Sequence, residues 1–298
     1  MSMTLLGEIE ETVAGVAAAQ GRAVVGIGTG WRVASGFVAA DGRVLTSAHR
    51  VGGGEVAVRF ADGRSATGAV GAADRDLGLA LVEVDTADVE PLGWAAGELR
   101  AGAAVVALAR PGERGLRASL GFVVATERRL RGARGRPVEG AIEHSTALPR
   151  GSAGGPLLDA SGGLVGINLL RVEGGLIVAL GGSARERIER LVGGESAEPR
   201  YLGVAVAPPR VARRLQRALG LPEREGVLVR AVEGGTPAAR AGLERGDLIV
   251  AAAGADLEGI DALHEAIAGA PGRLALTVVR GAEEREVEVD LGAEKEPA

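Results

Sequence analysis

Residues 151–158 read Gly-Ser-Ala-Gly-Gly-Pro-Leu-Leu, a run of small residues that leads into an apolar segment. The chain on either side of this run, from Ala23 to about Asn168, alternates short apolar stretches with glycine-containing turns. Asp41-Gly42 and Asp62-Gly63 each follow such a stretch, and Asp-Gly supplies the positive φ angles of a tight hairpin turn. Many short strands joined by such turns predict a mainly β domain, either a barrel or a sandwich.

The composition limits the class of protein. The chain has 298 residues, enough for two domains, and 46% of them are hydrophobic but only 2% aromatic, so the core must be built from aliphatic side chains. The absence of cysteine excludes disulfides, thiolate catalysis and cysteine-ligated metals. A formal net charge of −5 argues against a general nucleic-acid-binding protein. Neither a cofactor nor a metal site is expected.

Four segments in chain order carry a family resemblance. They are residues 34–38 (Ala-Ser-Gly-Phe-Val), 45–51 (Leu-Thr-Ser-Ala-His-Arg-Val), 74–82 (Asp-Arg-Asp-Leu-Gly-Leu-Ala-Leu-Val) and 151–158. Each resembles a segment of the HtrA (high-temperature-requirement) type of trypsin-like serine protease. The resemblance implies a chymotrypsin-like double β-barrel and the trypsin-like order of histidine, aspartate and serine along the chain.

Two of the three triad positions depart from the family pattern. The resemblance places the general base at His49, the aspartate position at Gly78 and the serine position at Ala153. A methyl group cannot attack a carbonyl, and loss of the serine alone costs on the order of a millionfold in turnover. The chain as written is therefore expected to be inactive. Two losses together favour natural decay of catalysis over a single serine-to-alanine replacement made for study.

Neighbouring residues offer weak substitutes. Ser152 is adjacent to Ala153, but a shift of one residue would move the attacking oxygen away from the oxyanion donors. Asp76 shares a strand face with Gly78, yet lies about 6–7 Å away along the strand, and is expected to be a solvent-facing turn acid. The oxyanion hole, assigned to Gly151, Ser152 and Ala153, uses main-chain N–H groups and needs no side chain. We expect the cleft to accept an extended polypeptide without cutting it.

The C-terminal third resembles a PDZ domain of the HtrA type. The resemblance rests on residues 201–204 (Tyr-Leu-Gly-Val), 235–243 (Gly-Thr-Pro-Ala-Ala-Arg-Ala-Gly-Leu) and 245–249 (Arg-Gly-Asp-Leu-Ile). PDZ domains bind a peptide C-terminus on backbone N–H groups and add the peptide as a strand. The implied peptide-binding residues are Tyr201, Leu202, Gly203, Val204, Val206, Leu263 and Ile267. The alternative is that the apolar ones only form the core.

Other segments complete the predicted organisation. Apolar residues at helical spacing from Leu5 to Val16 predict a packed terminal helix, and residues 183–192 predict a helix capped by Ser183. Thr236-Pro237 predicts an N-cap followed by a proline at the first helical position. The expected parts are an N-terminal helical segment (1–22), a trypsin-like domain (23–193), a linker (194–199), a PDZ domain (200–292) and a disordered tail (293–298).

Three further patterns are weighed against simpler explanations. The glycine loop at residues 26–30 superficially resembles a nucleotide-binding loop, but a hairpin follows it where such a site needs a helix. Arginines between Arg128 and Arg136 are expected to lie on a solvated loop, with an anionic-partner site as the alternative. His144 and His264 are isolated and are expected to be structural.

Partners and location follow from these features. Unfolded polypeptides or C-terminal peptides are the expected partners. The sequence does not decide whether the chain forms a homo-oligomer, although the lack of phenylalanine and tyrosine before Phe37 argues against an HtrA-like trimer. The acidic N-terminus has no signal-peptide character, which predicts a cytoplasmic protein, or an extracytoplasmic one if a membrane anchor has been removed. The leading functional prediction is a pseudoprotease that acts as chaperone, adaptor or regulator; the alternatives are an HtrA-type endopeptidase of protein quality control and a rigid platform for the PDZ domain.

Overall fold

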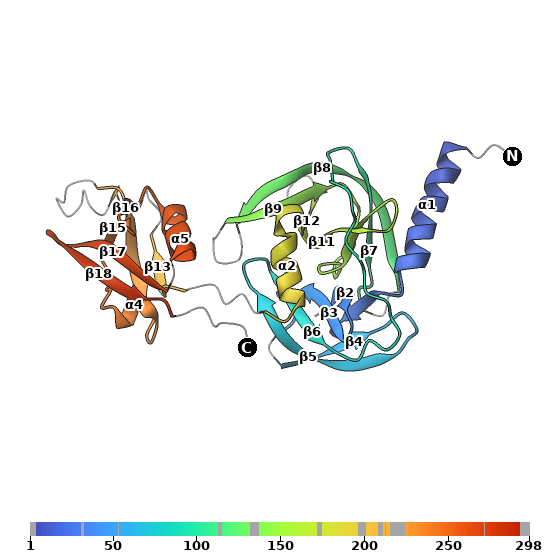
Figure 1. Ribbon diagram of the computed structural model, residues 1–298, viewed down its shortest axis with the longest axis horizontal. Coiled ribbons are helices and arrows are strands. Elements are labelled where there is room, and N and C mark those ends of the chain that lie inside the picture. Colours follow the sequence, from blue (N-terminus) through green and yellow to red (C-terminus); the bar gives the residue numbers. More distant parts are fainter. Residues whose placement is uncertain are drawn as a thin grey trace. The chain divides into compact units, whose positions relative to one another are not determined.

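The computed structural model describes residues 4–30, 33–52, 54–112, 115–131, 137–171, 175–195, 201–207, 211, 213–214, 224–270 and 272–292. The chain divides into two compact units, Met1–Glu198 and Pro199–Ala298 (Figure 1). In these described stretches no helix has both the length and the apolar character needed to cross a membrane.

The first unit contains two closed six-stranded antiparallel barrels. The first barrel has the strand order β1-β2-β3-β6-β5-β4. Its strands are β1 (Val24–Ile27), β2 (Ala34–Ala40), β3 (Arg43–Ser47), β4 (Gly54–Arg59), β5 (Ser65–Asp74) and β6 (Leu79–Glu83). The predicted Asp-Gly hairpins are confirmed: residues 41–42 join β2 to β3, and residues 62–63 lie in the β4–β5 connection. Of the two predicted architectures, barrel and sandwich, the closed strand order shows a barrel.

The second barrel has the strand order β10-β11-β12-β9-β8-β7. Its strands are β7 (Ala104–Ala109), β8 (Arg117–Arg131), β9 (Pro137–His144), β10 (Pro156–Asp159), β11 (Leu164–Arg171) and β12 (Ile177–Gly181). Aliphatic side chains fill both barrels, with Phe37 and Phe60 as the large aromatic exceptions. The run of small residues at 151–155 lies directly before β10, so the second barrel carries it.

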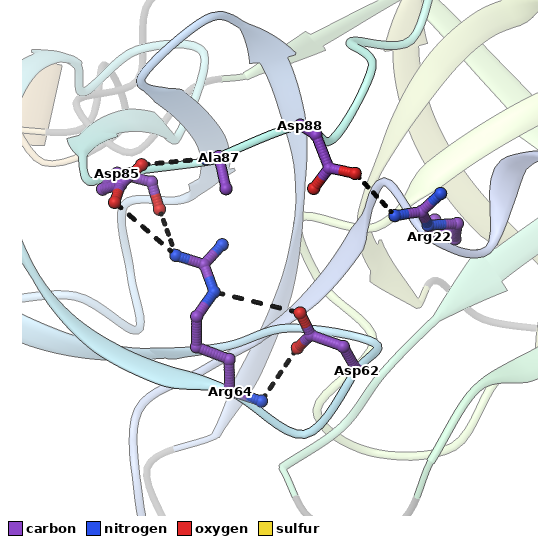
Figure 2. A network of polar contacts seen from close by, with 6 residues as sticks. All are labelled: Arg22, Asp62, Arg64, Asp85, Ala87 and Asp88. Atoms are coloured by element: carbon purple, nitrogen blue, oxygen red, sulfur yellow. Dashed lines mark hydrogen bonds and ion pairs between the residues drawn. The ribbon is translucent and has the colours of Figure 1, made fainter.

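Polar side chains tie the β4–β5 turn to the segment after β6 (Figure 2). Arg64 donates its backbone N–H to Asp62 Oδ1 at 2.8 Å and its Nη1 to the Asp85 carbonyl at 3.0 Å. The Arg64 guanidinium carbon also lies 4.0 Å from the centre of the Phe60 ring. Asp85 in turn accepts from the Ala87 N–H at 2.8 Å, and Arg22 pairs with Asp88 at 3.3 Å. These contacts connect the β4–β5 turn to residues 85–88, and Arg22 before β1 to Asp88.

Helix α1 (Leu5–Gln20) packs through only part of its apolar face. Thr4 caps it by accepting from the Gly7 N–H. Val16 is buried, whereas Leu5 and Leu6 are 72% and 77% exposed. The expected packed terminal helix is therefore correct for its C-terminal half, which contacts β7 and β8, and wrong for its first turns.

The predicted Ser183 cap is wrong. A 3₁₀ turn, η2 (Gly182–Ala184), precedes helix α2 (Arg185–Val192), and the residue at the N-cap position is Ala184. The Ser183 hydroxyl donates instead to Glu127 Oε2 at 2.6 Å, and its backbone N–H donates to the same carboxylate. The Ser183 side chain is therefore bonded to Glu127, 56 residues earlier in the sequence, and does not cap α2. Helix α2 packs against β5 and β6 with Ile188 and Leu191 buried.

The second unit is a small α+β domain. Its sheet runs β13-β14-β15-β17-β18, and β16 pairs with β15. The strands are β13 (Val204–Val206), β14 (Val227–Val232), β15 (Leu248–Ala252), β16 (Ala255–Asp256), β17 (Arg273–Arg280) and β18 (Glu283–Asp290). The helices α4 (Pro237–Arg240) and α5 (Ile260–Gly269) accompany them. The Thr236 cap and the proline at the start of α4 are confirmed.

One buried ion pair braces this domain. Asp247, fully buried, accepts from Arg280 Nε at 2.6 Å and Nη2 at 2.7 Å, and from the Glu244 N–H at 2.8 Å. Asp247 and the flanking Glu244 together raise the pKa of Arg280, with the Asp247 hydrogen bond as the largest cause. The predicted disordered tail and most of the helix expected at residues 211–219 lie outside the described residues.

Candidate active-site cleft and peptide-binding loop

His49 lies in the turn after β3, and Gly78 lies directly before β6. A methyl group added at Gly78 would lie 3.6 Å from His49 Cε1 and 4.0 Å from His49 Nδ1. The Ala48 N–H donates to the Gly78 carbonyl at 2.8 Å, which joins the two turns. A short side chain at position 78 would therefore face the imidazole, as the assigned aspartate position requires. Gly78 supplies no acceptor there, and its φ of +71° is a glycine-favoured conformation.

The two acidic residues before Gly78, Asp74 and Asp76, both lie near Arg187 of α2. Asp74 is fully buried and binds Arg187 of α2 through two contacts, 2.5 Å to Nε and 2.7 Å to Nη2. Asp74 Oδ1 also accepts from the backbone N–H groups of Asp76 and Leu77. The expectation that Asp76 faces solvent is wrong: it is 6% exposed, and its Oδ2 lies 3.8 Å from Arg187 Nη2. The partner, Arg187, comes from a helix more than 100 residues later, which no local pattern reveals.

The loop at residues 151–155 keeps a fixed backbone. The Ala153 carbonyl accepts from the Ser35 N–H at 3.0 Å, and Ser35 Oγ donates to the Gly151 carbonyl at 3.0 Å. Ser35 Oγ also accepts from the Arg110 N–H, so one hydroxyl joins this loop to the end of β7. Sequence reasoning did not assign this role to Ser35, because its partners lie 116 and 75 residues away.

Asn168 on β11 braces the same loop from the other side. Its side-chain Nδ2 donates to the carbonyls of Gly155 and Pro156, each at 3.0 Å, and its backbone carbonyl accepts from the Gly154 N–H at 2.7 Å. Gly154 has a φ of +89°. A methyl group added there would overlap the Ser35 carbonyl oxygen and lie 2.6 Å from the Ser47 nitrogen. The loop is thus pressed against the end of β3, two residues before His49.

The main-chain donors of the loop are available. Within the described stretches, neither the Gly151 N–H nor the Ala153 N–H donates to a protein acceptor. Ser152 points into the protein: the residue is 5% exposed and its Oγ is buried. A buried hydroxyl cannot reach a substrate carbonyl, which argues against Ser152 as a nucleophile. The assignment of the Gly151 and Ala153 N–H groups to an oxyanion hole stays a prediction.

His144 lies close to this brace. Its Nδ1 is 2.9 Å from Thr146 Oγ1, and the residue is fully buried. Burial lowers the pKa of His144 to about 4, although the Asn168 side chain opposes that effect in part. His144 is therefore neutral near pH 7, as a structural residue in the barrel wall.

Arginines 128 and 129 lie on a strand, and the expectation of a loop is wrong for them. Both belong to β8, where Arg128 lies 3.4 Å from Glu143 and Arg129 lies 2.7 Å from Glu139 on the neighbouring strand β9. Cross-strand carboxylates neutralise these two cations, which weakens the case for an anionic partner here. Arg134 and Arg136 lie outside the described residues.

The candidate carboxylate-binding loop of the PDZ domain spans Tyr201 to Val204. Its carbonyl groups are used within the domain: the Leu202 oxygen accepts from the Ala238 N–H and the Gly203 oxygen from the Glu233 N–H. Gly203 has a φ of +89°, and an added methyl group would overlap Thr236. Tyr201 Oη donates to Glu233 Oε2 at 2.5 Å. The backbone carbonyl groups of Leu202 and Gly203 are thus hydrogen-bonded within the domain, and β13 begins at Val204.

The two helical residues proposed for the groove lie in the core. Leu263 and Ile267 on α5 are 1% and 3% exposed and belong to the same buried cluster as Leu202. Val204 and Val206 on β13 are only partly buried. The strand therefore offers more accessible apolar surface than these two helical residues, and their role in peptide binding stays a prediction. No cluster of three metal-ligating side chains occurs in the described part of the chain.

Comparison with known proteins agrees with the two-unit architecture. Residues 28–167 match the family described as a trypsin-like peptidase domain, and residues 228–281 match a PDZ domain. HhoA of Synechocystis sp., a protein assigned to the serine proteases, is 32% identical over 266 residues, which cover 83% of this chain and 67% of HhoA. A protein of Brucella suis assigned as a DegP-like periplasmic serine endoprotease is 31% identical over 272 residues, which cover 87% of this chain and 52% of the relative. The chain thus spans about half the length of the DegP-like relatives it matches.

Solved structures show the same fold. The HtrA-type protease AlgW with a decapeptide superposes with a TM-score of 0.70 at 22% identity, over 96% of this chain and 99% of AlgW. The serine endoprotease from Yersinia pestis gives a TM-score of 0.68 at 20% identity, over 93% and 96% of the two chains. With the matches above, the chain belongs to the HtrA/DegP-type family of trypsin-like serine proteases that carry a C-terminal PDZ domain.

Proposed function

We propose that this protein is a pseudoprotease that binds unfolded segments or C-terminal peptides without cutting them, and so acts as a chaperone, adaptor or regulator. One observation carries the proposal. His49 faces the empty space at Gly78 where a carboxylate would orient it, and position 153 offers a methyl group where a hydroxyl would attack. A general base needs both an orienting acceptor and a nucleophile to deprotonate.

The retained backbone supports binding. The N–H groups of Gly151 and Ala153 stay available, and loop 151–155 is held by Ser35 and Asn168. Main-chain donors of this kind bind the carbonyl oxygen of an extended polypeptide. In the second unit, the loop at residues 201–204 and the partly buried strand β13 would bind a peptide C-terminus. The decapeptide bound to AlgW supports a peptide ligand for this chain too, and the periplasmic assignment of the Brucella relative supports an extracytoplasmic place of action.

The second candidate function is an endopeptidase of protein quality control in which only the serine has been replaced. The unbroken frame of loop 151–155 favours it, since that frame is what a serine at position 153 would need. Gly78 speaks against it, because a single replacement at position 153 does not account for the missing carboxylate.

Two measurements on the full chain test the proposal. We expect no cleavage in a casein-degradation time course, and we expect a bound extended peptide to protect residues 151–155 or 201–206 from hydrogen exchange. Cleavage of casein by the unmodified chain would overturn inactivity. Absence of protection in both segments at saturating peptide would overturn the binding role. Protection confined to residues 201–206 would favour a PDZ domain on an inert platform.

A further inference from the structure

A cavity of about 750 Å³ opens beside Gly151 in the first unit. Its described lining comes from the loop after β1, the turn after β3, the end of β4, the loop after β7 and the residue before Gly151. The lining residues are Gly26, Gly28, Thr29, Gly30, Val33, Arg50, Arg59, Pro111, Gly112, Arg150 and Gly151. The cavity therefore shares Gly151 with the proposed oxyanion hole, and Arg50 directly follows His49.

The charged residues of the described lining are all arginines. Arg50, Arg59 and Arg150 belong to it, and the described lining contains no aspartate or glutamate. Arg50 and Arg150 are exposed, and within the described stretches no carboxylate lies within ion-pair distance of either. This differs from the arginines of β8 and α2, which pair with glutamate or aspartate. Exposed cationic side chains beside a cavity, here Arg50 and Arg150, attract an anion.

Glycine leaves open space at one point of the wall. A methyl group at Gly30 would meet no atom within 4 Å. Gly30 and Gly112 have φ angles of +63° and +61°, conformations that suit glycine. A backbone wall of this kind lets a ligand chain approach closely while the arginine side chains reach its charged groups.

We propose that this cavity binds an acidic side chain, aspartate or glutamate, of the polypeptide that lies across loop 151–155. The proposal rests on the proposed function, since the polypeptide must first occupy the loop at Gly151. Arginine is suited to this task because its planar guanidinium donates two parallel hydrogen bonds to one carboxylate. The shared position of Gly151 makes a carboxylate on the bound polypeptide a better fit than a free anion.

The test compares two short synthetic peptides with alternating valine in their sequence. One carries glutamate and the other glutamine at the intervening positions, and both end in an amide so that no terminal carboxylate engages the PDZ domain. Isothermal titration with the full chain measures affinity, and hydrogen exchange at residues 28–30 and 150–155 reports where each peptide binds. We expect the glutamate peptide to bind about tenfold more tightly, a typical effect of one charge-assisted contact.

Arginine variants assign the preference to the cavity. Arg50→Gln and Arg150→Gln are each expected to remove most of the preference for glutamate over glutamine. Arg100→Gln is the matched control, because Arg100 is exposed and lies outside the described lining; it should leave the preference unchanged. Thermal unfolding of all three variants verifies that each is folded.

The outcomes separate this inference from the proposed function. Equal binding of both peptides at residues 150–155 would overturn the acidic preference and leave the binding role intact. Binding of neither peptide would overturn both. If inorganic phosphate binds with the same dependence on Arg50 and Arg150 while the two peptides bind equally, the cavity takes small anions and the peptide proposal is overturned. A preference that survives both variants would also overturn it.

Discussion

The loop at residues 151–155 is hydrogen-bonded to both barrels, whereas the segment at residues 74–78 has two buried acidic residues and, at the position that faces His49, a glycine. Both contain a glycine in the left-handed region, Gly154 at φ +89° and Gly78 at φ +71°. A methyl group added at Gly154 would overlap backbone atoms of β2 and β3, whereas one added at Gly78 would meet, among the described residues, only the His49 ring. Packing therefore constrains the first loop strongly, while the positive φ angle is the main cost of a side chain at the second position.

Gly154→Ala is the sharpest way to break the tightly packed loop. The added methyl group would overlap the Ser35 carbonyl oxygen, and backbone cannot move aside as a flexible side chain can. Overpacking plus a disfavoured φ angle is expected to cost more than about 3 kcal/mol of unfolding free energy. Urea unfolding measures this. An alanine variant within about 1 kcal/mol of the parent would show that the loop is less constrained than its contacts indicate.

Arg187→Ala tests what holds the segment before Gly78. It would leave Asp74, which is fully buried, without its cation, at an expected cost of about 3 kcal/mol. Arg190→Ala is the matched control on the same helix, since its pair with Glu186 is mostly exposed and is worth less than about 1 kcal/mol. Equal losses for the two variants, measured by urea unfolding, would contradict a special role for the buried pair.

The pH dependence of stability tests the burial of His144, which lies beside Asn168 behind loop 151–155. Its folded pKa of about 4 lies below the ordinary histidine value, so the folded protein binds fewer protons than the unfolded chain. Stability should therefore fall as pH drops from about 6.5 toward about 4, and the histidine contribution between about pH 7 and pH 5 is roughly 2 kcal/mol. His144→Gln should lose less stability than the parent over this range. Parallel pH dependences of the two proteins would contradict the burial of a neutral imidazole.

Gly78→Ala is expected to have the smallest effect. The added methyl group has room at 3.6 Å from His49 Cε1, so the cost is the positive φ angle alone, about 1 kcal/mol. Thermal unfolding beside Gly154→Ala compares the two glycines directly. A larger loss at Gly78 than at Gly154 would reverse the contrast between the two loops.

Much of this organisation follows from local patterns in the sequence. The Asp-Gly hairpins and the Thr236-Pro237 helix start depend on neighbouring residues, and the structure has them as predicted. Ser183, Asp76 and Arg128 were mispredicted for one common physical reason. Each is positioned by a partner distant in the chain or on a neighbouring strand, namely Glu127, Arg187 and Glu143. Local propensity does not contain such long-range contacts.

The same distinction between local pattern and long-range contact applies to the candidate site. Motif order assigns His49, Gly78 and Ala153 to the triad positions. A methyl group at Gly78 would lie 3.6 Å from His49 Cε1, and the role of position 153 stays a prediction. The bracing roles of Ser35 and Asn168, and the arginine-lined cavity, depend on segments brought together only by barrel closure. No spacing in the sequence predicts them.

The central claim is that the chemistry is missing while the scaffold that would support it remains. The most direct test is a casein-degradation time course with the unmodified chain, Ala153→Ser, and Gly78→Asp/Ala153→Ser, each verified as folded by thermal unfolding. Aspartate tolerates positive φ better than most residues, and its carboxylate would reach His49 Nδ1. We expect no cleavage by the unmodified chain, slow cleavage by the single variant, and cleavage faster by roughly 10⁴ with the double variant, the usual effect of the triad aspartate. Cleavage by the unmodified chain, or a folded double variant no faster than the single one, would contradict the account.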